Sequence, residues 1–198
     1  GNAGQHMAAI LEIEGHRIIA VSDSKSAVYR ATGLDVQRLI DHKENTGSVR
    51  GFAGAEQITH ENLLKTPGDV LVLAALAGTI TQQNAPGIKA NLILELANGP
   101  VAKDAEQLLL ERDVIVLPDI LANAGGVTVS YFEWVQNLSG DMWSEDYINK
   151  RLYSMMKTAF EDTHKIAREK DIGLRKAAYV LALQRIARAE TVRGRLST

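Results

Sequence analysis

Residues 118–134 read PDILANAGGVTVSYFEW. An apolar run, Val114–Leu117, precedes this stretch, and the proline at its start stops strand pairing because it has no backbone N–H to donate. Asn123 is able to cap a helix, Gly125-Gly126 allows close backbone approach, and residues 127–138 have helical spacing. The pattern therefore predicts a strand, a polar glycine-rich loop and a helix. In open α/β sheets, ligands bind at such strand ends.

The composition narrows the class of protein. The chain has 198 residues, a net charge of −2 and no cysteine. We therefore expect one domain, or one domain with a helical extension, and no nucleic-acid or anionic-membrane partner. Disulfides and cysteine-based sites are excluded, and the scattered histidines lack metal-ligand spacing, so no metal is expected. No apolar run reaches the ~18 residues that span a bilayer, and no signal peptide is visible. We expect a cytoplasmic protein.

Short apolar runs alternate with amphipathic segments along the first two thirds of the chain. We expect buried strands at residues 17–22 and 69–73, and further strands at 91–95 and 113–117. Helices are expected from the first residues up to Gly15, at 35–45, from residue 59 and at 103–112. This alternation predicts an α/β fold with a doubly wound, mostly parallel, Rossmann-like sheet.

The pattern changes after about residue 139. A long helix is expected at 144–170, where apolar residues including Met155 form one stripe, and Met155 and Met156 are interpreted as core residues. A second helix is expected at 174–191, with one face made of Tyr179, Leu183 and Ile186. We therefore predict a dinucleotide-binding domain over 1–139 and a helical segment over 140–198.

The chain begins with Gly1-Asn2-Ala3-Gly4 and then a helix. These glycines have the spacing of the last two in the dinucleotide-binding pattern G-x-G-x-x-G. The first glycine, and the strand that precedes it at the centre of the usual sheet, are not present. We expect a fragment whose two half-sheets lack their shared strand. G-x-x-G alone is weak evidence, and a glycine-rich start without a functional role is the alternative.

Several stretches in one order resemble the Glu/Leu/Phe/Val dehydrogenase family, and its glutamate dehydrogenase branch in particular. They are Gly1–Gly4, Ala20–Lys25, Ala97–Pro100, the opening stretch and the tail from Arg175 to Gly194. The resemblance implies reversible oxidative deamination of L-glutamate to 2-oxoglutarate and ammonium with NAD(P)+, and a homohexamer. It also implies that the catalytic lysine and aspartate belong to an N-terminal domain with no counterpart here. No catalytic residue is therefore expected in this chain, and the chain alone is expected to be inactive.

The resemblance also assigns coenzyme-binding roles. Gly1, Asn2, Ala3 and Gly4 would lie under the pyrophosphate, where the N–H groups at a helix start favour an anion. Asp23 lies at the expected place for the acid that binds the adenosine ribose, which favours NAD, whereas Ser24 and Lys25 beside it would suit the phosphate of NADP. An ordinary turn residue is the alternative for Asp23.

The remaining site residues follow three other strands. Ala74 and Ala75 would pass close to the coenzyme ribose, and Asn98 and Asn123 resemble the nicotinamide-side asparagines of the family; an Asx-turn or helix cap is the alternative for either asparagine. Val127 and Ser130 lie three residues apart, so they face the same side of the helix. By resemblance they line the substrate side-chain pocket, where the Ser130 hydroxyl would bind the γ-carboxylate; a bond back to a helix carbonyl is its alternative.

Three positions depart from the family pattern. Leu73 stands where proline is usual, Ala77 where an acid is common and Leu96 where glycine is expected. Leu96 would distort its loop if that position needed a positive φ. Two alternatives to the glutamate enzyme therefore stay open. One is a leucine- or valine-type dehydrogenase, against which Ser130 argues, and the other is a non-catalytic regulatory or nucleotide-binding paralogue.

Overall fold

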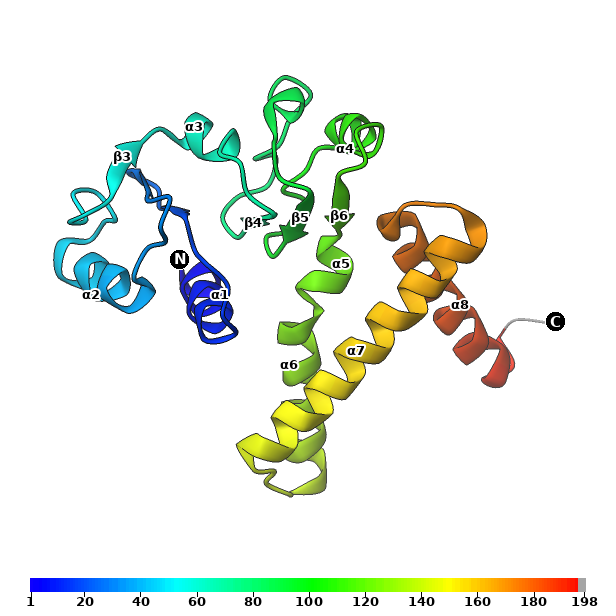
Figure 1. Cartoon of the computed structure of the whole chain (residues 1–198). Helices are drawn as coiled ribbons and strands as arrows, with labels where there is room; N and C mark the ends of the chain where they lie inside the picture. Colours follow the sequence, from blue (N-terminus) through cyan, green and yellow to red (C-terminus); the bar gives the residue numbers. More distant parts are fainter. Residues whose placement is uncertain (196–198) are drawn as a thin grey trace. The chain divides into compact units, whose positions relative to one another are not determined.

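The structure is a computed structural model that describes residues 1–195. It has the α/β class predicted from the sequence, with helices and two three-stranded sheets among the described residues (Figure 1). The chain divides into two compact units, Gly1–Ile115 and Val116–Thr198, and the last three residues lie outside the described range. The functional division into 1–139 and 140–198 stays a prediction.

The first half of unit 1 contains an antiparallel sheet in the order β1-β2-β3. Its strands are β1 (Ala20–Ser22), β2 (Ala27–Tyr29) and β3 (Glu56–Ile58). Its helices are α1 (Asn2–Ile13), α2 (Val36–Thr46) and α3 (His60–Leu64). β2 was not expected. The segment between β1 and β2 is far too short for a parallel crossover, so the chain returns as a hairpin and pairs antiparallel.

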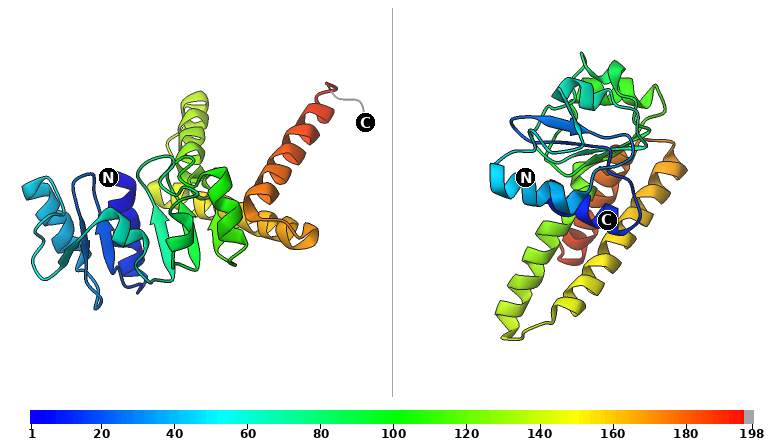
Figure 2. Two further views of the ribbon diagram at one scale, coloured as in Figure 1. Left: turned by 90° about the horizontal axis from the view of Figure 1, so that it is seen from above. Right: turned by 60° about the vertical axis from the view of Figure 1, so that its left-hand side comes forward.

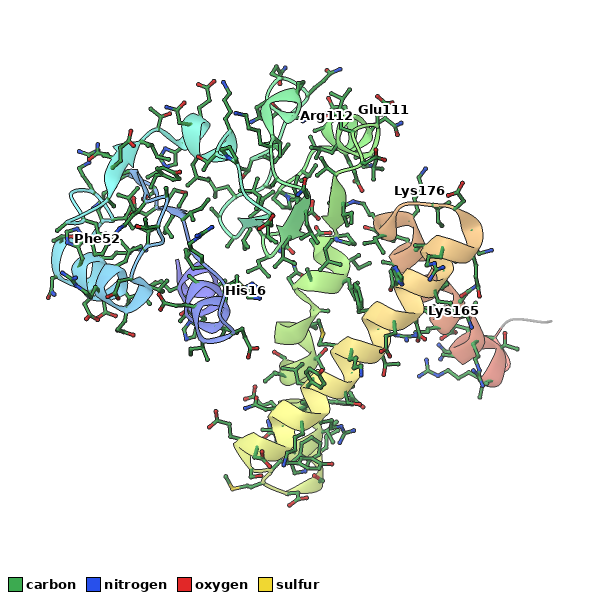
Figure 3. The ribbon with its side chains drawn as sticks, viewed as in Figure 1. His16, Phe52, Glu111, Arg112, Lys165 and Lys176 are labelled. Carbon is green, nitrogen blue, oxygen red and sulfur yellow. The ribbon has the colours of Figure 1, made fainter. Side chains whose placement is uncertain are left out.

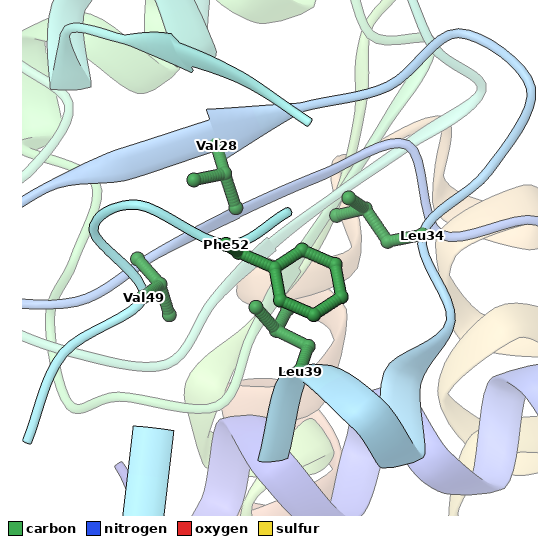
Figure 4. Close-up of a cluster of buried hydrophobic side chains, with 5 residues drawn as sticks. All are labelled: Val28, Leu34, Leu39, Val49 and Phe52. Atoms are coloured by element: carbon green, nitrogen blue, oxygen red, sulfur yellow. The ribbon is translucent and has the colours of Figure 1, made fainter. Parts of the chain in front are cut away.

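A small apolar core holds this half of the unit together. It consists of Val28, Leu34, Leu39, Val49 and Phe52, each 7% exposed or less (Figure 4). α2 contributes Leu39 to this core. The helix begins after Asp35, which accepts a hydrogen bond from the Arg38 N–H, and it ends at Gly47, which lies in the left-handed region. The core fixes the segments on either side of the β1–β2 turn.

The second half of unit 1 contains the parallel strands predicted from the sequence. β4 (Val70–Leu73) pairs parallel with β5 (Leu92–Glu95), and β6 (Ile115–Leu117), which begins at the last residue of unit 1, belongs to the same sheet. A 3-10 turn, η1 (Ala85–Gly87), and α4 (Lys103–Leu110) complete it. Arg112, labelled in Figure 3, donates to the carbonyls of Ala85 and Ile88, both at 2.7 Å, and so fixes η1 to the end of α4.

Unit 2 is helical after β6. It contains α5 (Asp119–Ala122), α6 (Ala124–Ser139), α7 (Glu145–Lys170) and α8 (Leu174–Val192), and α6 and α7 form a helical hairpin (Figure 2). Gly140 in the left-handed region ends α6, and the Ser144 hydroxyl accepts from the Tyr147 N–H to cap α7. Arg151 lies over the rings of Phe132 and Trp143, at 5.1 and 4.9 Å from their centroids, and joins the two helices near the turn.

Several burial predictions are wrong. β1 was expected to be covered on both faces, yet none of its residues is buried, and Val70 in β4 is 52% exposed. β1 and β4 are edge strands of their sheets in the described structure. The predicted inner face of α8 is also exposed, with Tyr179, Leu183 and Ile186 at 52, 64 and 60%. The small residues Ala177 and Ala178 are buried in that helix instead.

The methionine prediction is also not confirmed. Met155 is 44% exposed and Met156 is only partly buried, so neither is a core residue of the described chain. The residue of α7 that is fully buried is Thr163, whose hydroxyl donates to the Ala159 carbonyl at 2.7 Å. This bond satisfies the polar group within its own helix, which allows the helix to bury a threonine where the periodicity indicated apolar residues.

Candidate functional site

The start of α1 lies beside the end of β4. A Cβ added to Gly4 would lie 3.6 Å from the Cβ of Ala74, and a Cβ on Gly1 would meet no heavy atom within 4 Å. The structure therefore places the start of α1 against the loop that follows β4, as expected. Asn2 and Ala3 in the same turn of helix are exposed.

Asp23 lies in the turn between β1 and β2, and its carboxylate is largely occupied by protein donors. Oδ1 accepts from the backbone N–H groups of Lys25 at 2.8 Å and Ser26 at 2.9 Å, and Oδ2 from the N–H of Val49 at 2.7 Å. Burial opposes ionisation, but these amides and the Ser48 side chain lower the pKa of Asp23 to about 2. Because a carboxylate has about four acceptor sites, little capacity is left for a ligand.

A basic pocket lies next to this turn. It has a volume of about 460 Å³ and is lined by Lys25, Thr46, Ser48 and Arg50. Lys25 Nζ donates to the Gly47 carbonyl at 3.1 Å, and Arg50 Nη2 donates to the Lys25 carbonyl at 3.0 Å. Two cationic side chains, Lys25 and Arg50, in one open pocket suit an anion. Sequence reasoning named Lys25 but missed Arg50, which lies 27 positions from Asp23 along the chain.

The loops after β4 and β5 are joined by backbone hydrogen bonds. Gly78 N donates to the Gly99 carbonyl and Ile80 N to the Pro100 carbonyl, both at 2.9 Å. The loop of Ala74 and Ala75 and the loop of Asn98 therefore lie side by side at one edge of the sheet, as predicted. Ala75 and Asn98 are exposed and Ala74 is partly buried.

Leu96, the departure that mattered most, does not distort its loop. Among the described residues, the non-glycine positions with positive φ are Asp113 and Asp171, so Leu96 has an ordinary backbone. Its N–H donates to the Leu73 carbonyl at 2.9 Å, and the left-handed position of the loop is Gly99, with φ at 56°. Ala77 is exposed in the neighbouring turn, and nothing in the structure requires an acid there.

Asn123 stands between α5 and α6 in unit 2. It is the N-cap residue of α6, as predicted, but its side chain makes no capping hydrogen bond there. Gly125 and Gly126 follow, and a Cβ on either would meet no heavy atom within 4 Å. Nothing in the described protein therefore requires glycine at these two positions, in contrast to Gly140 at the end of the helix.

Val127 and Ser130 lie on the exposed part of α6. Val127 is 70% exposed, and Ser130 is also exposed. The Thr128 hydroxyl donates to the Ala124 carbonyl at 2.8 Å and that of Ser139 to the Val135 carbonyl at 3.0 Å. Over the described residues, the Ser130 hydroxyl makes no such bond. The alternative interpretation of Ser130, a bond back to its helix, is therefore not what the structure contains.

Asp119 and Arg175 form a feature that sequence reasoning missed. Arg175 Nη1 in the first turn of α8 lies 2.8 Å from Asp119 Oδ1 at the start of α5, and the two side chains are only 20 and 19% exposed. Both residues belong to stretches singled out above, but 56 positions separate them. No periodicity or motif could have shown that they are paired.

Within residues 1–195, no group of three or more His, Asp or Glu side chains is arranged to hold a metal ion. None of the helices in that range is long and apolar enough to cross a membrane.

Comparison with known proteins gives one consistent family. Residues 1–194 match the family model described as Glutamate/Leucine/Phenylalanine/Valine dehydrogenase. Over 195 residues the chain is 46% identical to the glutamate dehydrogenase of Thermotoga maritima. The aligned region covers 98% of this chain and 47% of that protein. The chain therefore spans about half the length of the curated relative it matches.

Solved structures agree. The hetero-hexameric glutamate dehydrogenase of Thermus thermophilus, in a leucine-bound form, superposes on 100% of this chain with a TM-score of 0.90 and 31% identity, over 46% of its own length. Glutamate dehydrogenase from Peptoniphilus asaccharolyticus superposes on 98% of the chain with a TM-score of 0.81 and 32% identity, over 45% of its length. The chain belongs to the Glu/Leu/Phe/Val dehydrogenase family, whose members are oxidoreductases that use a nicotinamide coenzyme.

Proposed function

We propose that this chain is the coenzyme-binding part of a glutamate dehydrogenase, which oxidises L-glutamate to 2-oxoglutarate and ammonium with NAD(P)+. The observation that carries the choice of glutamate is Ser130, an exposed hydroxyl without a hydrogen bond to the described protein. A hydroxyl on the same helix face as Val127 suits a substrate carboxylate, whereas an aliphatic substrate would leave it unpaired. The identity to the Thermotoga maritima glutamate dehydrogenase supports the same choice.

The coenzyme-binding residues are assigned to three parts of the coenzyme. Gly1, Asn2, Ala3 and Gly4 would hold the pyrophosphate at the start of α1, where the helix dipole favours an anion and no side chain obstructs Gly1. Ala74 and Ala75 would lie against the ribose, and Asn98 and Asn123 would orient the nicotinamide. The nicotinamide takes the hydride from the substrate Cα, and the protein supplies orientation and exclusion of water.

We propose NAD as the coenzyme, with NADP also accepted. The negative charge of Asp23 opposes a 2′-phosphate, but three backbone N–H groups already occupy its oxygens, so it contributes little as a ribose acceptor. Lys25 and Arg50 in the adjacent pocket would attract that phosphate. In the full-length protein, Arg50→Met should lower kcat/KM for NADP+ several-fold more than for NAD+. Equal effects on the two coenzymes would remove the pocket from this proposal.

The protein as a whole is proposed to be a homohexamer in the cytoplasm. The hetero-hexameric relative from Thermus thermophilus supports a six-subunit assembly, although its subunits are of more than one kind. The regulatory alternative rested chiefly on Leu96, and the ordinary backbone at that residue takes most of this support away.

The experiment is a comparison of substrates in the full-length protein. Glutamate, leucine and valine should each be tested with NAD+ and with NADP+ by following reduction of the coenzyme. We expect turnover with glutamate, and a kcat/KM for leucine at least about 100-fold lower, because an unpaired polar pocket rejects an apolar side chain. Absence of turnover with glutamate and either coenzyme would reject the proposal, and preference for leucine would favour the branched-chain alternative.

A further inference from the structure

The partly buried ion pair between Asp119 and Arg175 lies close in sequence to Asn123, a residue of the candidate site. Asp119 opens α5, which ends at Ala122, and Asn123 follows directly. Asp119 Oδ1 accepts from Arg175 Nη1 and from the Ile120 N–H, both at 2.8 Å. The carboxylate therefore joins the first turn of α8 to the segment that leads into Asn123.

α5 cannot hold its own position. A helix of four residues has almost no intrinsic stability in water, so its placement depends on contacts with the rest of the unit. Within unit 2, α5 contacts α6, α7 and α8. Leu121 supplies an apolar anchor at 6% exposure, and Arg175 supplies the charged one. Together they leave Asn123 little freedom to shift along or around the chain axis.

The position of Arg175 on its own helix indicates that it serves its partner. α8 begins at Leu174, and a cation in the first turn of a helix is disfavoured by the helix dipole. α8 has no acidic residue in that turn to offset the charge. The side chain is also mostly buried, which is costly for a charge unless it is paired. These costs are offset by the bond to Asp119.

We propose that Arg175 is a positioning residue for Asn123, acting through Asp119 and α5, and thereby fixes the reactive end of the coenzyme site. This rests on the proposed function, in which Asn123 faces the nicotinamide. The residues proposed for the pyrophosphate and the adenosine belong to other segments of the chain, at the start of α1 and in the turn after β1. Loss of the pair should therefore lower kcat and leave coenzyme affinity nearly unchanged.

The chain offers a matched control. Arg185 Nη2 lies 2.8 Å from Asp162 Oδ2. This second arginine–aspartate pair joins α8 to α7. That pair is 54 and 45% exposed, and Arg185 lies ten positions beyond Arg175 along α8. Arg185→Met therefore removes one arginine from α8 and one ion pair, without touching the segment before Asn123.

The test uses the full-length protein with Arg175→Met, Asp119→Asn and Arg185→Met. We expect Arg175→Met and Asp119→Asn to lower kcat at least tenfold while the KM for the coenzyme stays within twofold. Arg185→Met should match the wild type, and Arg175→Lys should recover part of the loss. If Arg175→Met does not fold, Asp119→Asn tests the proposal in its place, because asparagine keeps the shape of the aspartate side chain and removes only its charge. Wild-type kcat in Asp119→Asn would overturn the proposal.

A second readout tests the positioning role without depending on turnover. Hydrogen–deuterium exchange of the backbone over residues 119–126 should rise in Arg175→Met and Asp119→Asn and stay unchanged in Arg185→Met. That result would support the positioning role even if the wild type did not turn over glutamate, which would reject only the proposed function. Unchanged exchange over 119–126 in both variants would overturn the positioning role.

Discussion

Asp23 and Ser130 are both polar residues in exposed parts of the fold, one in a turn of unit 1 and the other on α6 in unit 2. The Asp23 carboxylate accepts three backbone hydrogen bonds, and its pKa is lowered to about 2. The Ser130 hydroxyl has no hydrogen bond to the described protein. A side chain that the protein has already satisfied contributes to the fold, whereas an unsatisfied exposed one is available to a ligand. Both residues were assigned to the same site from the sequence.

The largest expected effect is that of Asp23→Ala on stability. The change removes the acceptor of the N–H groups of Lys25, Ser26 and Val49. The turn after β1 and the loop at Val49 then lose the hydrogen bonds that connect them. We expect the free energy of unfolding of the full-length protein to fall by about 2–3 kcal/mol. Chemical denaturation followed by circular dichroism measures it. A change below about 0.5 kcal/mol would show that the turn does not depend on this carboxylate.

Ser130→Ala should have the opposite profile. Stability should stay within about 0.5 kcal/mol, because an exposed hydroxyl without a protein partner is lost. The KM for glutamate should rise roughly 10- to 100-fold, the equivalent of a lost hydrogen bond to a charged group. The KM for the coenzyme should not change, which steady-state kinetics with both substrates varied will show. Thr128→Val, which removes a hydroxyl already bonded to its own helix, is the control.

The pH dependence of stability sharpens the contrast. Because the pKa of Asp23 is lowered on folding to about 2, its ionised form stabilises the native state above the unfolded pKa near 4. That contribution is lost as the pH falls from about 4 towards 2, and partial exposure limits it to about 1–2 kcal/mol. The difference in stability between the wild type and Asp23→Asn should therefore be constant from pH 7 to 5 and shrink from pH 4 to 3. No such pH dependence is expected for Ser130→Ala.

Gly4→Ala distinguishes a structural role from a coenzyme-binding role at a third position. A Cβ at Gly4 would make an ordinary contact of 3.6 Å with Ala74, and alanine is favoured over glycine within a helix by about 0.5–1 kcal/mol. Stability should therefore be unchanged or slightly raised. The KM for the coenzyme should rise several-fold if the pyrophosphate approaches this backbone closely. Unchanged coenzyme kinetics would place the pyrophosphate elsewhere.

The smallest expected effect is that of Leu96→Gly. Leu96 has no positive φ, so glycine relieves no strain and adds flexibility to the unfolded chain. We expect a loss of about 0.5–1 kcal/mol in stability and no gain in coenzyme affinity. Tighter coenzyme binding in this variant would restore the view that Leu96 impairs the loop.

Local patterns predicted most of the helices and the parallel strands. The periodicity of residues 144–170 and the glycine at 173 predicted α7 and its end to within one residue. The alternation of strands and helices also predicted that the loops of Ala74 and Asn98 are neighbours. These features depend on residues close together in the chain, where period and turn chemistry act directly.

Features that depend on distant partners could not be predicted. Val49, which lies 26 positions beyond Asp23, turns that carboxylate into a structural acceptor. Arg175 binds Asp119 across 56 positions. The exposed face of α8 was expected to be buried because periodicity shows which residues share a face, but not what covers it. The motifs therefore indicated the candidate site. The structure was needed to distinguish residues whose polar groups already have partners in the protein from those whose polar groups do not.

A crystal structure of the full-length protein with glutamate and coenzyme bound would test the role of Ser130 most directly. If the unpaired hydroxyl is reserved for the substrate, Ser130 Oγ should lie about 2.6–3.0 Å from an oxygen of the γ-carboxylate. A γ-carboxylate held by other groups, with Ser130 Oγ more than about 4 Å away or bonded to the protein, would contradict it.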